Sequence, residues 1–340
     1  MKIARKVIGK IARKVIGERS VYFDRFIFQL GSRTTVLDAA IEHYGRQRVF
    51  CHLGSFLSVK SVDVEGELGT FTGSIDDFAA LGTYMKNRTW APQLQSLLRT
   101  CFKSGGTFID VGANIGLTLV PVASNRSVRC YGFEPEPLNF SYLARNVAAN
   151  CKFDNVRLHQ LALFDKSTTL PFELATNHSG DHRIQINRAD GAMDEQFRPT
   201  IQVKSERLDA LHLDLQRPLA VKIDTQGAEP NIFVGGRETL AKADLIAFEF
   251  WPYAMRRIGG DVSQMIDFVA DTFAEGPIAV DDMVEDMTWR PIKAFAKLRH
   301  GSDGLAVSDH DLTPALHRRV RVSPSGKPRK SNVPWEGGRQ

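Results

Sequence analysis

The feature that most constrains this chain is a short apolar stretch that leads into a glycine turn and then into a helix-compatible segment. Residues 107–119 read TFIDVGANIGLTL, with Gly112 and Gly116 in the turn. In open α/β sheets such turns lie at the carboxyl ends of strands, where ligands bind. Glycine lets the backbone approach a nucleotide closely, and the following helix start offers unpaired N–H groups. The segment therefore predicts a doubly wound α/β sheet with a ligand at this turn.

Two acidic residues follow predicted strands near the turn. Asp110 ends the first strand, and Glu134 follows the next strand, 129–133, 24 residues later. An acid at about this spacing accepts hydrogen bonds from ribose hydroxyls. The turn reads D-x-G-x-x-x-G and lacks the second glycine that lets a pyrophosphate approach. A nucleoside with a cationic amino-acid end fits better, so we expect S-adenosylmethionine as the cofactor and not NAD.

Three motifs occur in order along the chain: FIDVGANIG, FEPEP and KIDTQGAEPNIFVGG. Together they resemble the FkbM family of S-adenosylmethionine-dependent methyltransferases, over roughly residues 102–250. The resemblance implies a class I methyltransferase fold, a Rossmann-like doubly wound sheet, here with N-terminal and C-terminal extensions. It also implies O-methylation of a hydroxyl on a sugar, a glycan or a small metabolite.

The resemblance assigns roles to individual positions in the cofactor site. Glu134 would hold the ribose, and Ala162, in a third predicted strand at 156–163, would lie beside the adenine. The residues implied at the methionine end of the cofactor are Asp110, Gly112, Asn114 and Gly116.

A further acid, Asp224, ends the fourth predicted strand, within LAVKIDTQGAE. Because carboxyl ends of parallel strands share one edge of a sheet, we expect Asp224 in one crevice with Asp110 and Glu134. Methylation of an alcohol requires loss of its proton, and Asp224 is the first candidate to take that proton or to orient the hydroxyl. His178 and His182 are the next candidates.

Two positions concern the acceptor pocket. Glu249 falls inside the fifth predicted strand, 244–251, where a charge is costly without a partner. It is either a pocket carboxylate or the ion-pair partner of Lys222 or an arginine, and we expect it, with His178, on the substrate side. The family usually has Glu where this chain has Gln226, so a role that needs a carboxylate there is in doubt.

Composition divides the chain into five segments. The core is expected to carry the cofactor site, and the flanking segments on either side of it are expected to wall the acceptor pocket. In chain order, the segments are a basic amphipathic stretch at 1–20, an α/β lead-in at 21–100, the methyltransferase core at 101–252, the C-terminal part of the core domain at 253–316, and a basic disordered tail at 317–340.

The formal net charge of +5 comes from the two ends of the chain. Residues 1–20 and 317–340 each hold seven Lys or Arg against one Glu, so the remainder is acidic. No specific nucleic-acid partner is therefore expected. The tandem copy KIARKVIG at 2–17 would form an apolar stripe beside a basic one on a helix. It indicates either weak peripheral membrane contact through residues 1–17 or a frayed or partner-docked helix.

The sequence shows neither an apolar run that could span a bilayer nor a secretory signal, so we expect a cytoplasmic protein. If residues 1–17 contact a membrane, we expect the inner membrane face. The four cysteines form no C-x-x-C pair and no His/Asp spacing demands a metal, so none is expected. A nucleotide-linked dehydrogenase is disfavoured by the missing G-x-G-x-x-G. The alternative is a non-catalytic Rossmann-like scaffold or membrane-associated binding module. The acceptor and the oligomeric state do not follow from the sequence.

Overall fold

The computed structural model describes residues 60–77, 79–175, 178–186, 197–277, 289–291 and 315–318. The expectations for the repeat at 2–17 and for the tail beyond Arg318 lie outside these residues. Within the described part of the chain, every helix is too short or too polar to cross a membrane.

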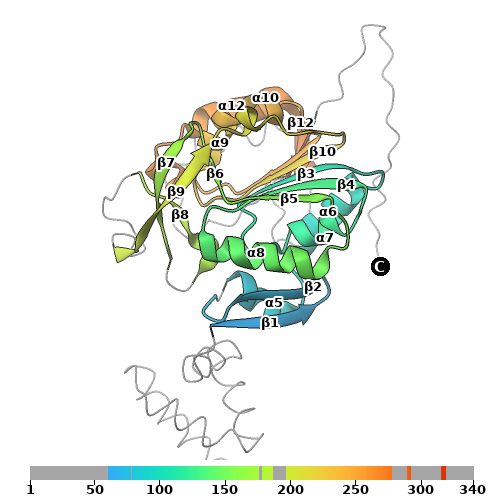
Figure 1. Cartoon of the computed structure of the whole chain (residues 1–340). Helices are drawn as coiled ribbons and strands as arrows, with labels where there is room; N and C mark the ends of the chain where they lie inside the picture. The colour runs from blue at the N-terminus through green and yellow to red at the C-terminus, as the bar shows by residue number, and fades with distance from the viewer. Residues whose placement is uncertain are drawn as a thin grey trace, which may run out of the picture.

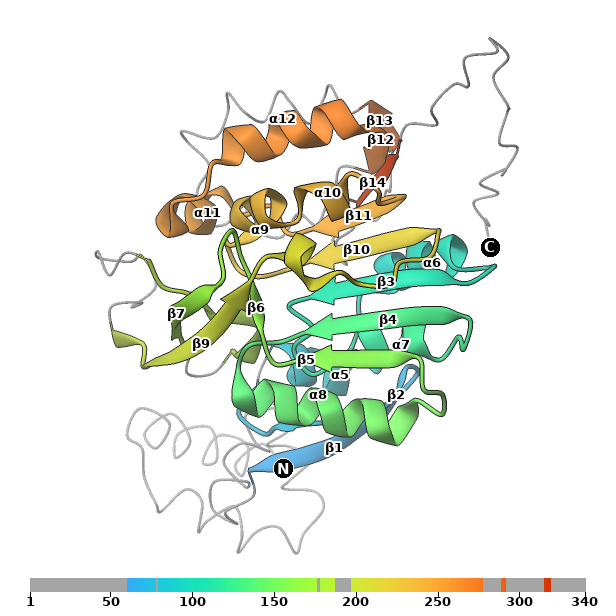
Figure 2. The same ribbon diagram turned by 45° about the horizontal axis from the view of Figure 1, so that its top comes forward.

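An eight-stranded sheet forms the centre of the molecule, in the order β13-β12-β14-β11-β10-β3-β4-β5 (Figure 2). Neighbours from β11 to β5 run parallel, and the pairs that involve β12, β13 and β14 are antiparallel. The strands are β3 (Gly106–Val111), β4 (Val128–Phe133), β5 (Val156–His159), β10 (Leu219–Ile223), β11 (Leu245–Phe248), β12 (Phe273–Pro277), β13 (Trp289–Pro291) and β14 (Ala315–Arg318).

The order of these strands reverses at β3, the first strand of the sheet in the sequence. From β3 the chain adds β4 and β5 on one side and later β10 and β11 on the other. Such a reversal opens a crevice at the carboxyl ends of the central strands, and this is where ligands bind in open α/β folds. The predicted doubly wound Rossmann-like sheet is confirmed.

Helices cover both faces of the sheet (Figure 1). Successive strand residues point to opposite faces, so Phe108 packs in the core with α6, α7 and α8, whereas Ile109 packs in the core with α9, α10 and α12. Strands buried on both faces read as continuous apolar runs, which is why β3 and β10 stand out in the sequence. The helices are α6 (Pro92–Cys101), α7 (Leu119–Ala123), α8 (Pro137–Asn150), α9 (Glu229–Gly235), α10 (Arg237–Leu240), α11 (Pro252–Ile258) and α12 (Val262–Thr272).

The described part of the lead-in forms a hairpin, β1 (Ser61–Gly66) and β2 (Gly69–Ser74), followed by α5 (Ala80–Asn87). This unit lies against α8 on the side away from the sheet (Figure 1). The buried amide of Asn146 fixes it there: Oδ1 accepts from Thr72 N at 2.7 Å, and Nδ2 donates to the carbonyls of Thr72 at 2.9 Å and Ile115 at 2.8 Å. The lead-in is therefore joined directly to the glycine turn.

A second, four-stranded sheet stands beside the carboxyl ends of the main sheet, in the order β6-β9-β7-β8. Its core carries buried charge, because Glu173 and Arg183 are both fully buried and lie 3.4 Å apart. Its strands are β6 (Ala162–Leu163), β7 (Thr168–Glu173), β8 (Arg183–Ile184) and β9 (Thr200–Glu206), with short 3₁₀ helices η1 (Ser179–Asp181) and η3 (Leu208–Leu211).

Two predicted strands differ from the observed ones. The stretch 156–163 is divided into β5, at the edge of the main sheet, and β6, which pairs with β9 in the second sheet. The fifth strand ends at Phe248, so Glu249 lies just past its carboxyl end and not within it. A charge there reaches the cavity at the sheet edge, which lowers the cost of placing it after an apolar strand.

Candidate active site

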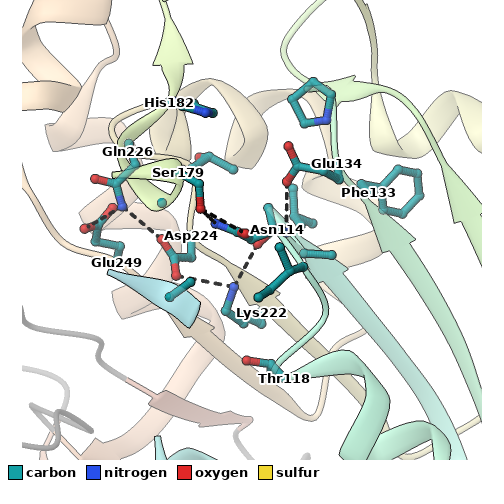
Figure 3. A pocket seen from close by; sticks show the side chains of 18 of the residues that line it. Asn114, Thr118, Phe133, Glu134, Ser179, His182, Lys222, Asp224, Gln226 and Glu249 are labelled. Carbon is teal, nitrogen blue, oxygen red and sulfur yellow. Dashed lines mark hydrogen bonds and ion pairs between the residues drawn. The ribbon is translucent and has the colours of Figure 1, made fainter. Parts of the chain in front are cut away.

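A cavity of about 300 Å³ lies at the carboxyl ends of β3, β4 and β10, with walls from the lead-in and the second sheet (Figure 3). It occupies the place where the strand order reverses. The polar side chains that line it are Asn114, Thr118, Glu134, His178, Ser179, His182, Lys222, Asp224, Thr225, Gln226 and Glu249.

Glu134 directly follows β4 and is 5% exposed. Its Oε2 accepts a hydrogen bond from Asn114 N at 2.9 Å, and its Oε1 accepts one from Glu136 N at 3.1 Å. Burial raises the pKa of Glu134 to about 7, against the lowering effect of these two donors. Because a carboxylate oxygen accepts more than one hydrogen bond, Glu134 can also receive bonds from hydroxyl groups in the cavity.

The glycine turn after β3 touches the turn after β10. Gly112 has φ +77°, and a Cβ there would lie 1.9 Å from the carbonyl oxygen of Asp224. Asn114 is also left-handed, with φ 49°. Gly116 packs against Leu143 and does not line the cavity, whereas Gly112 and Asn114 do.

A buried lysine, Lys222, links two carboxylates at the floor of the cavity. Its Nζ lies 3.2 Å from Asp110 Oδ1 and 3.4 Å from Asp224 Oδ2, and it donates to the carbonyl of Gly112 at 3.2 Å. Burial alone would lower the pKa of Lys222, but Asp110 and Asp224 raise it, so the side chain stays cationic. Asp110 is fully buried behind this lysine and does not line the cavity.

Asp224, Gln226 and Glu249 form a connected group on one side of the cavity (Figure 3). Asp224 is the most exposed of the acids that line the cavity, with a side chain 37% exposed. Gln226 Nε2 donates to Asp224 Oδ1 at 3.1 Å and to Glu249 Oε1 at 3.1 Å. Glu249 therefore contacts an amide, while Lys222 pairs with Asp110 and Asp224.

The turn that carries Asp224 and Gln226 is held by the fully buried Glu229. Its Oε1 accepts from both Thr225 N and Thr225 Oγ1 at 2.8 Å, and its Oε2 accepts from Gly227 N at 2.9 Å. Burial raises the pKa of Glu229 to about 7, against these donors. Glu229 shapes the turn without lining the cavity.

Residues 178–182, here called the strap, line another side of the cavity. Ser179 Oγ donates to Asp77 Oδ2 at 2.8 Å, and Asn139 Nδ2 donates to the carbonyl of Ser179 at 3.2 Å. His182 Nδ1 accepts from Ala175 N at 3.0 Å, and burial lowers the pKa of His182 to about 4. His182 is therefore neutral near pH 7. Both His182 and His178 line the cavity.

An apolar patch completes the lining. Leu161, Ala162 and Leu163 follow β5 and contribute no polar side chain. Glu134 N donates to the carbonyl of His159 at 3.1 Å, so this patch begins close to the Glu134 carboxylate. The cavity therefore has an apolar surface next to Glu134, which can accept hydrogen bonds from hydroxyl groups.

The structure brings most of the predicted site residues together. Gly112, Asn114, Glu134, Ala162, His178, Asp224 and Glu249 line the cavity, while Asp110 and Gly116 support it from behind. Sequence reasoning missed Ser179 and assigned Lys222 only as a partner for Glu249. The sequence Lys-Ile-Asp at the end of β10 could have indicated the pairing of Lys222 with Asp224, because side chains two positions apart along a strand point to the same face. Among the described residues, no three His, Cys, Asp or Glu side chains are grouped so as to hold a metal ion.

Comparison with known proteins identifies a methyltransferase domain in the chain. The family model described as "Methyltransferase FkbM domain" matches residues 110–274. The chain is 28% identical over 180 residues to "2-O-methyltransferase NoeI" of Sinorhizobium fredii (strain NBRC 101917 / NGR234), which covers 46% of this chain and 67% of that protein. It is 27% identical over 152 residues to "Methyltransferase sdnD" of Sordaria araneosa, covering 37% of this chain and 59% of that protein.

Among solved structures, M. jannaschii TYW2 in complex with AdoMet matches with a TM-score of 0.36 and 11% identity, over 77% of this chain and 87% of that chain. A likeness at this level carries no functional weight. The family match includes the glycine turn, Glu134, Asp224 and Glu249, which are the parts that build the cavity. The chain therefore carries a methyltransferase FkbM domain over residues 110–274.

Proposed function

We propose that this protein is an S-adenosylmethionine-dependent O-methyltransferase that acts on a hydroxyl of a sugar, a glycan or a small metabolite. One observation carries the proposal: a single cavity is lined both by Glu134, whose carboxylate can accept hydrogen bonds from hydroxyl groups, and by the partly exposed carboxylate of Asp224. The FkbM domain supports methyl transfer, and the relative named a 2-O-methyltransferase supports oxygen as the acceptor atom.

The lining fits the cofactor group by group. Glu134 would hold the ribose hydroxyls, and the patch around Ala162 would lie beside the adenine. The backbone at Gly112 and Asn114 would border the methionine end. The acids of the lining outnumber its one lysine, so the cavity favours a ligand with positive charge. When bound, S-adenosylmethionine supplies a methyl group on a positively charged sulfur.

Asp224 is the residue that we assign to the acceptor hydroxyl. Its Oδ2 lies 3.4 Å from Lys222 Nζ, and its carboxylate can accept a hydrogen bond from the hydroxyl and orient the hydroxyl oxygen. An alcohol oxygen becomes strongly acidic as it is alkylated, so even a weakly basic carboxylate can take its proton. Much of the rate then comes from holding the oxygen at near-attack distance. Glu249 and His178 are proposed to contact the rest of the acceptor.

Two further proposals rest on the sequence. The basic amphipathic repeat at 2–17 supports weak contact with an anionic membrane surface. The division into five segments also stays a proposal, with the qualification that strands β12 and β14, outside the 101–252 core, belong to the same sheet as β11.

The test is calorimetric titration of the full chain with S-adenosylmethionine and, separately, with NAD. We expect S-adenosylmethionine to bind and NAD to give no heat, and Glu134→Gln to weaken binding at least tenfold by loss of the ribose acceptor, about 1.4 kcal/mol. Glu136→Gln is the matched control, because Glu136 is also buried but caps α8 through Asn139 N and does not line the cavity.

Transfer of a labelled methyl group is then measured against neutral sugars and glycans, with Asp224→Asn as the reaction-deficient variant. We expect Asp224→Asn to bind S-adenosylhomocysteine, which lacks the positive charge, as the natural chain does, and to lose turnover. Absence of cofactor binding in the natural chain would overturn the proposal in favour of the scaffold alternative.

A further inference from the structure

The side-chain amide of Gln226 lies between the carboxylates of Asp224 and Glu249 and donates a hydrogen bond to each. We propose that Gln226 is a positioning residue that holds Asp224 and Glu249 as a pair of ionised carboxylates on the acceptor side of the cavity. This inference rests on the proposed function and deepens it, because it states what organises the acceptor side of the site.

The contact geometry supports this role. A primary amide nitrogen carries two hydrogens. Gln226 Nε2 lies 3.1 Å from Asp224 Oδ1 and 3.1 Å from Glu249 Oε1, so one nitrogen serves both acids, one hydrogen to each. Figure 3 shows the amide between the two carboxyl groups, across the cavity from Glu134.

The charge of the surroundings explains the choice of a neutral side chain. Two carboxylates that share one donor atom repel each other, and a hydrogen bond to each stabilises the ionised forms without cancelling their charge. A glutamate at this position would add a third acid and require a shared proton. The other titratable groups that face or adjoin the set are Lys222 below Asp224, Asp110 behind that lysine, Glu229 in the same turn, Glu134 across the cavity, and His178 and His182 on the strap.

The backbone at Gln226 has a conformation that a side chain disfavours. Gln226 has φ 57°, the left-handed region that favours glycine. Non-glycine residues are held in this region chiefly where the surrounding structure requires it, often at functional sites. Glu229 supplies that constraint through its bonds to Thr225 and Gly227 on either side. Glycine would fit this backbone without strain but would remove the amide.

The experiment compares the full-length natural chain with Gln226→Glu, Gln226→Gly and the double variant Gln226→Glu/Glu249→Gln. Calorimetry measures the affinities for S-adenosylmethionine and S-adenosylhomocysteine from pH 6 to 8.5. These ligands differ by one methyl group and one positive charge, so the ratio of their dissociation constants reports the charge near the methyl position. Titration of Glu134 acts on the ribose shared by both ligands and is largely cancelled in the ratio.

In the natural chain the ratio changes with pH only through Glu229, which titrates near pH 7 behind the turn and is common to all the variants, so the natural chain supplies the baseline. In Gln226→Glu the third carboxylate loses its proton within this range, and the preference for S-adenosylmethionine should rise roughly three- to tenfold toward high pH. The double variant restores two acids and one amide, so its ratio should follow the baseline. Gln226→Gly should unfold within a few degrees of the natural chain, yet lose turnover of any acceptor found.

A Gln226→Glu ratio as flat as that of the natural chain, or a double variant that is no flatter than Gln226→Glu, would overturn the role of Gln226 and leave the proposed function intact. If neither ligand binds to the natural chain, the proposed function and this inference fall together. A large loss of stability in Gln226→Gly would show that the amide serves the fold and not the site.

Discussion

Ser179 Oγ donates a hydrogen bond to Asp77 Oδ2 at 2.8 Å, although the two residues are 102 positions apart in the chain. Asp77 also accepts from the backbone N–H groups of Ala79, Ala80 and Leu81, and in this way starts α5. One carboxylate therefore begins a helix of the lead-in and fixes the strap across the cavity.

Replacement of Ser179 by alanine should release the strap while leaving the start of α5 intact. We expect a loss of about 1 kcal/mol in unfolding free energy, the usual net contribution of one such hydrogen bond. Amide hydrogen exchange should rise at residues 178–184 and stay unchanged in α5. Asp77→Ala is the comparison and should raise exchange in both places. Equal exchange profiles for the two variants would contradict this account.

The turns after β3 and β10 meet at Gly112, which leaves no room for a side chain. With φ +77° and a Cβ position 1.9 Å from the Asp224 carbonyl oxygen, Gly112→Ala must push the two turns apart. We expect loss of cofactor binding by calorimetry and a lowered melting temperature. The control is Gly116→Ala, which has a similar positive φ but faces the movable end of Leu143, so it should retain more binding. The reverse ranking would argue against contact between the turns.

The centre of the fold could be predicted from local patterns because the parallel strands β3, β4, β10 and β11 are buried on both faces. Their apolar runs end in glycine or acid, and each end was identifiable within a few residues. The division of 156–163 into strands of two sheets could not be predicted, because β6 has only two residues and is defined by its pairing with β9, about 40 positions later.

In the candidate site, too, contacts between residues far apart in the sequence could not be predicted. Asp224 and Glu134 follow strands and were found from that position alone. Ser179 gave no comparable signal, because its contact with Asp77 depends on packing between segments far apart in sequence. Asp110 was expected to meet a ligand, but Lys222 from the neighbouring strand lies between it and the cavity, a cross-strand pairing that local pattern does not reveal.

Cofactor affinity should depend on pH through Glu134. Burial raises the pKa of Glu134 to about 7, and only the ionised carboxylate offers both oxygens as acceptors to the ribose hydroxyls. We therefore expect the affinity for S-adenosylhomocysteine, measured by calorimetry, to increase as the pH rises through 7. In Glu134→Gln the affinity should be lower and nearly independent of pH over that interval. A natural chain with flat affinity from pH 6 to 8 would contradict the ribose assignment.

The Lys222–Asp110 pair should show strong coupling. Lys222→Met leaves the fully buried Asp110 without the cation 3.2 Å away and should cost about 3–5 kcal/mol of unfolding free energy. Lys222→Met/Asp110→Asn removes the uncompensated charge, so we expect it to be more stable than Lys222→Met alone. Urea unfolding of the natural chain, Lys222→Met, Asp110→Asn and the double variant measures the coupling. Strict additivity would mean that the pair contributes no mutual stabilisation.

The last prediction concerns Glu229 and the pH dependence of stability. Burial raises the pKa of Glu229 from its ordinary value of 4.5 to about 7 in the folded chain. A group whose pKa is higher in the folded state contributes stability that is fully present below pH 4.5 and is lost as the pH rises through 7. Glu134 acts in the same direction. His182, whose pKa is lowered from 6.5 to about 4, opposes them, because stability is gained as the pH rises from about 4 through 6.5. Two acids act against one histidine, so the unfolding free energy should still fall between pH 5 and 8.

Glu229→Gln tests this contribution. The amide cannot accept all the hydrogen bonds from Thr225 and Gly227, so at pH 5 we expect a loss of about 1–3 kcal/mol, the usual cost of unsatisfied buried donors. The decrease in stability from pH 5 to 8 should be smaller than in the natural chain, because Glu229 no longer contributes to it. Urea unfolding at both pH values measures this difference. An unchanged pH dependence would mean that Glu229 is ionised throughout, and the three donors around it would then outweigh its burial.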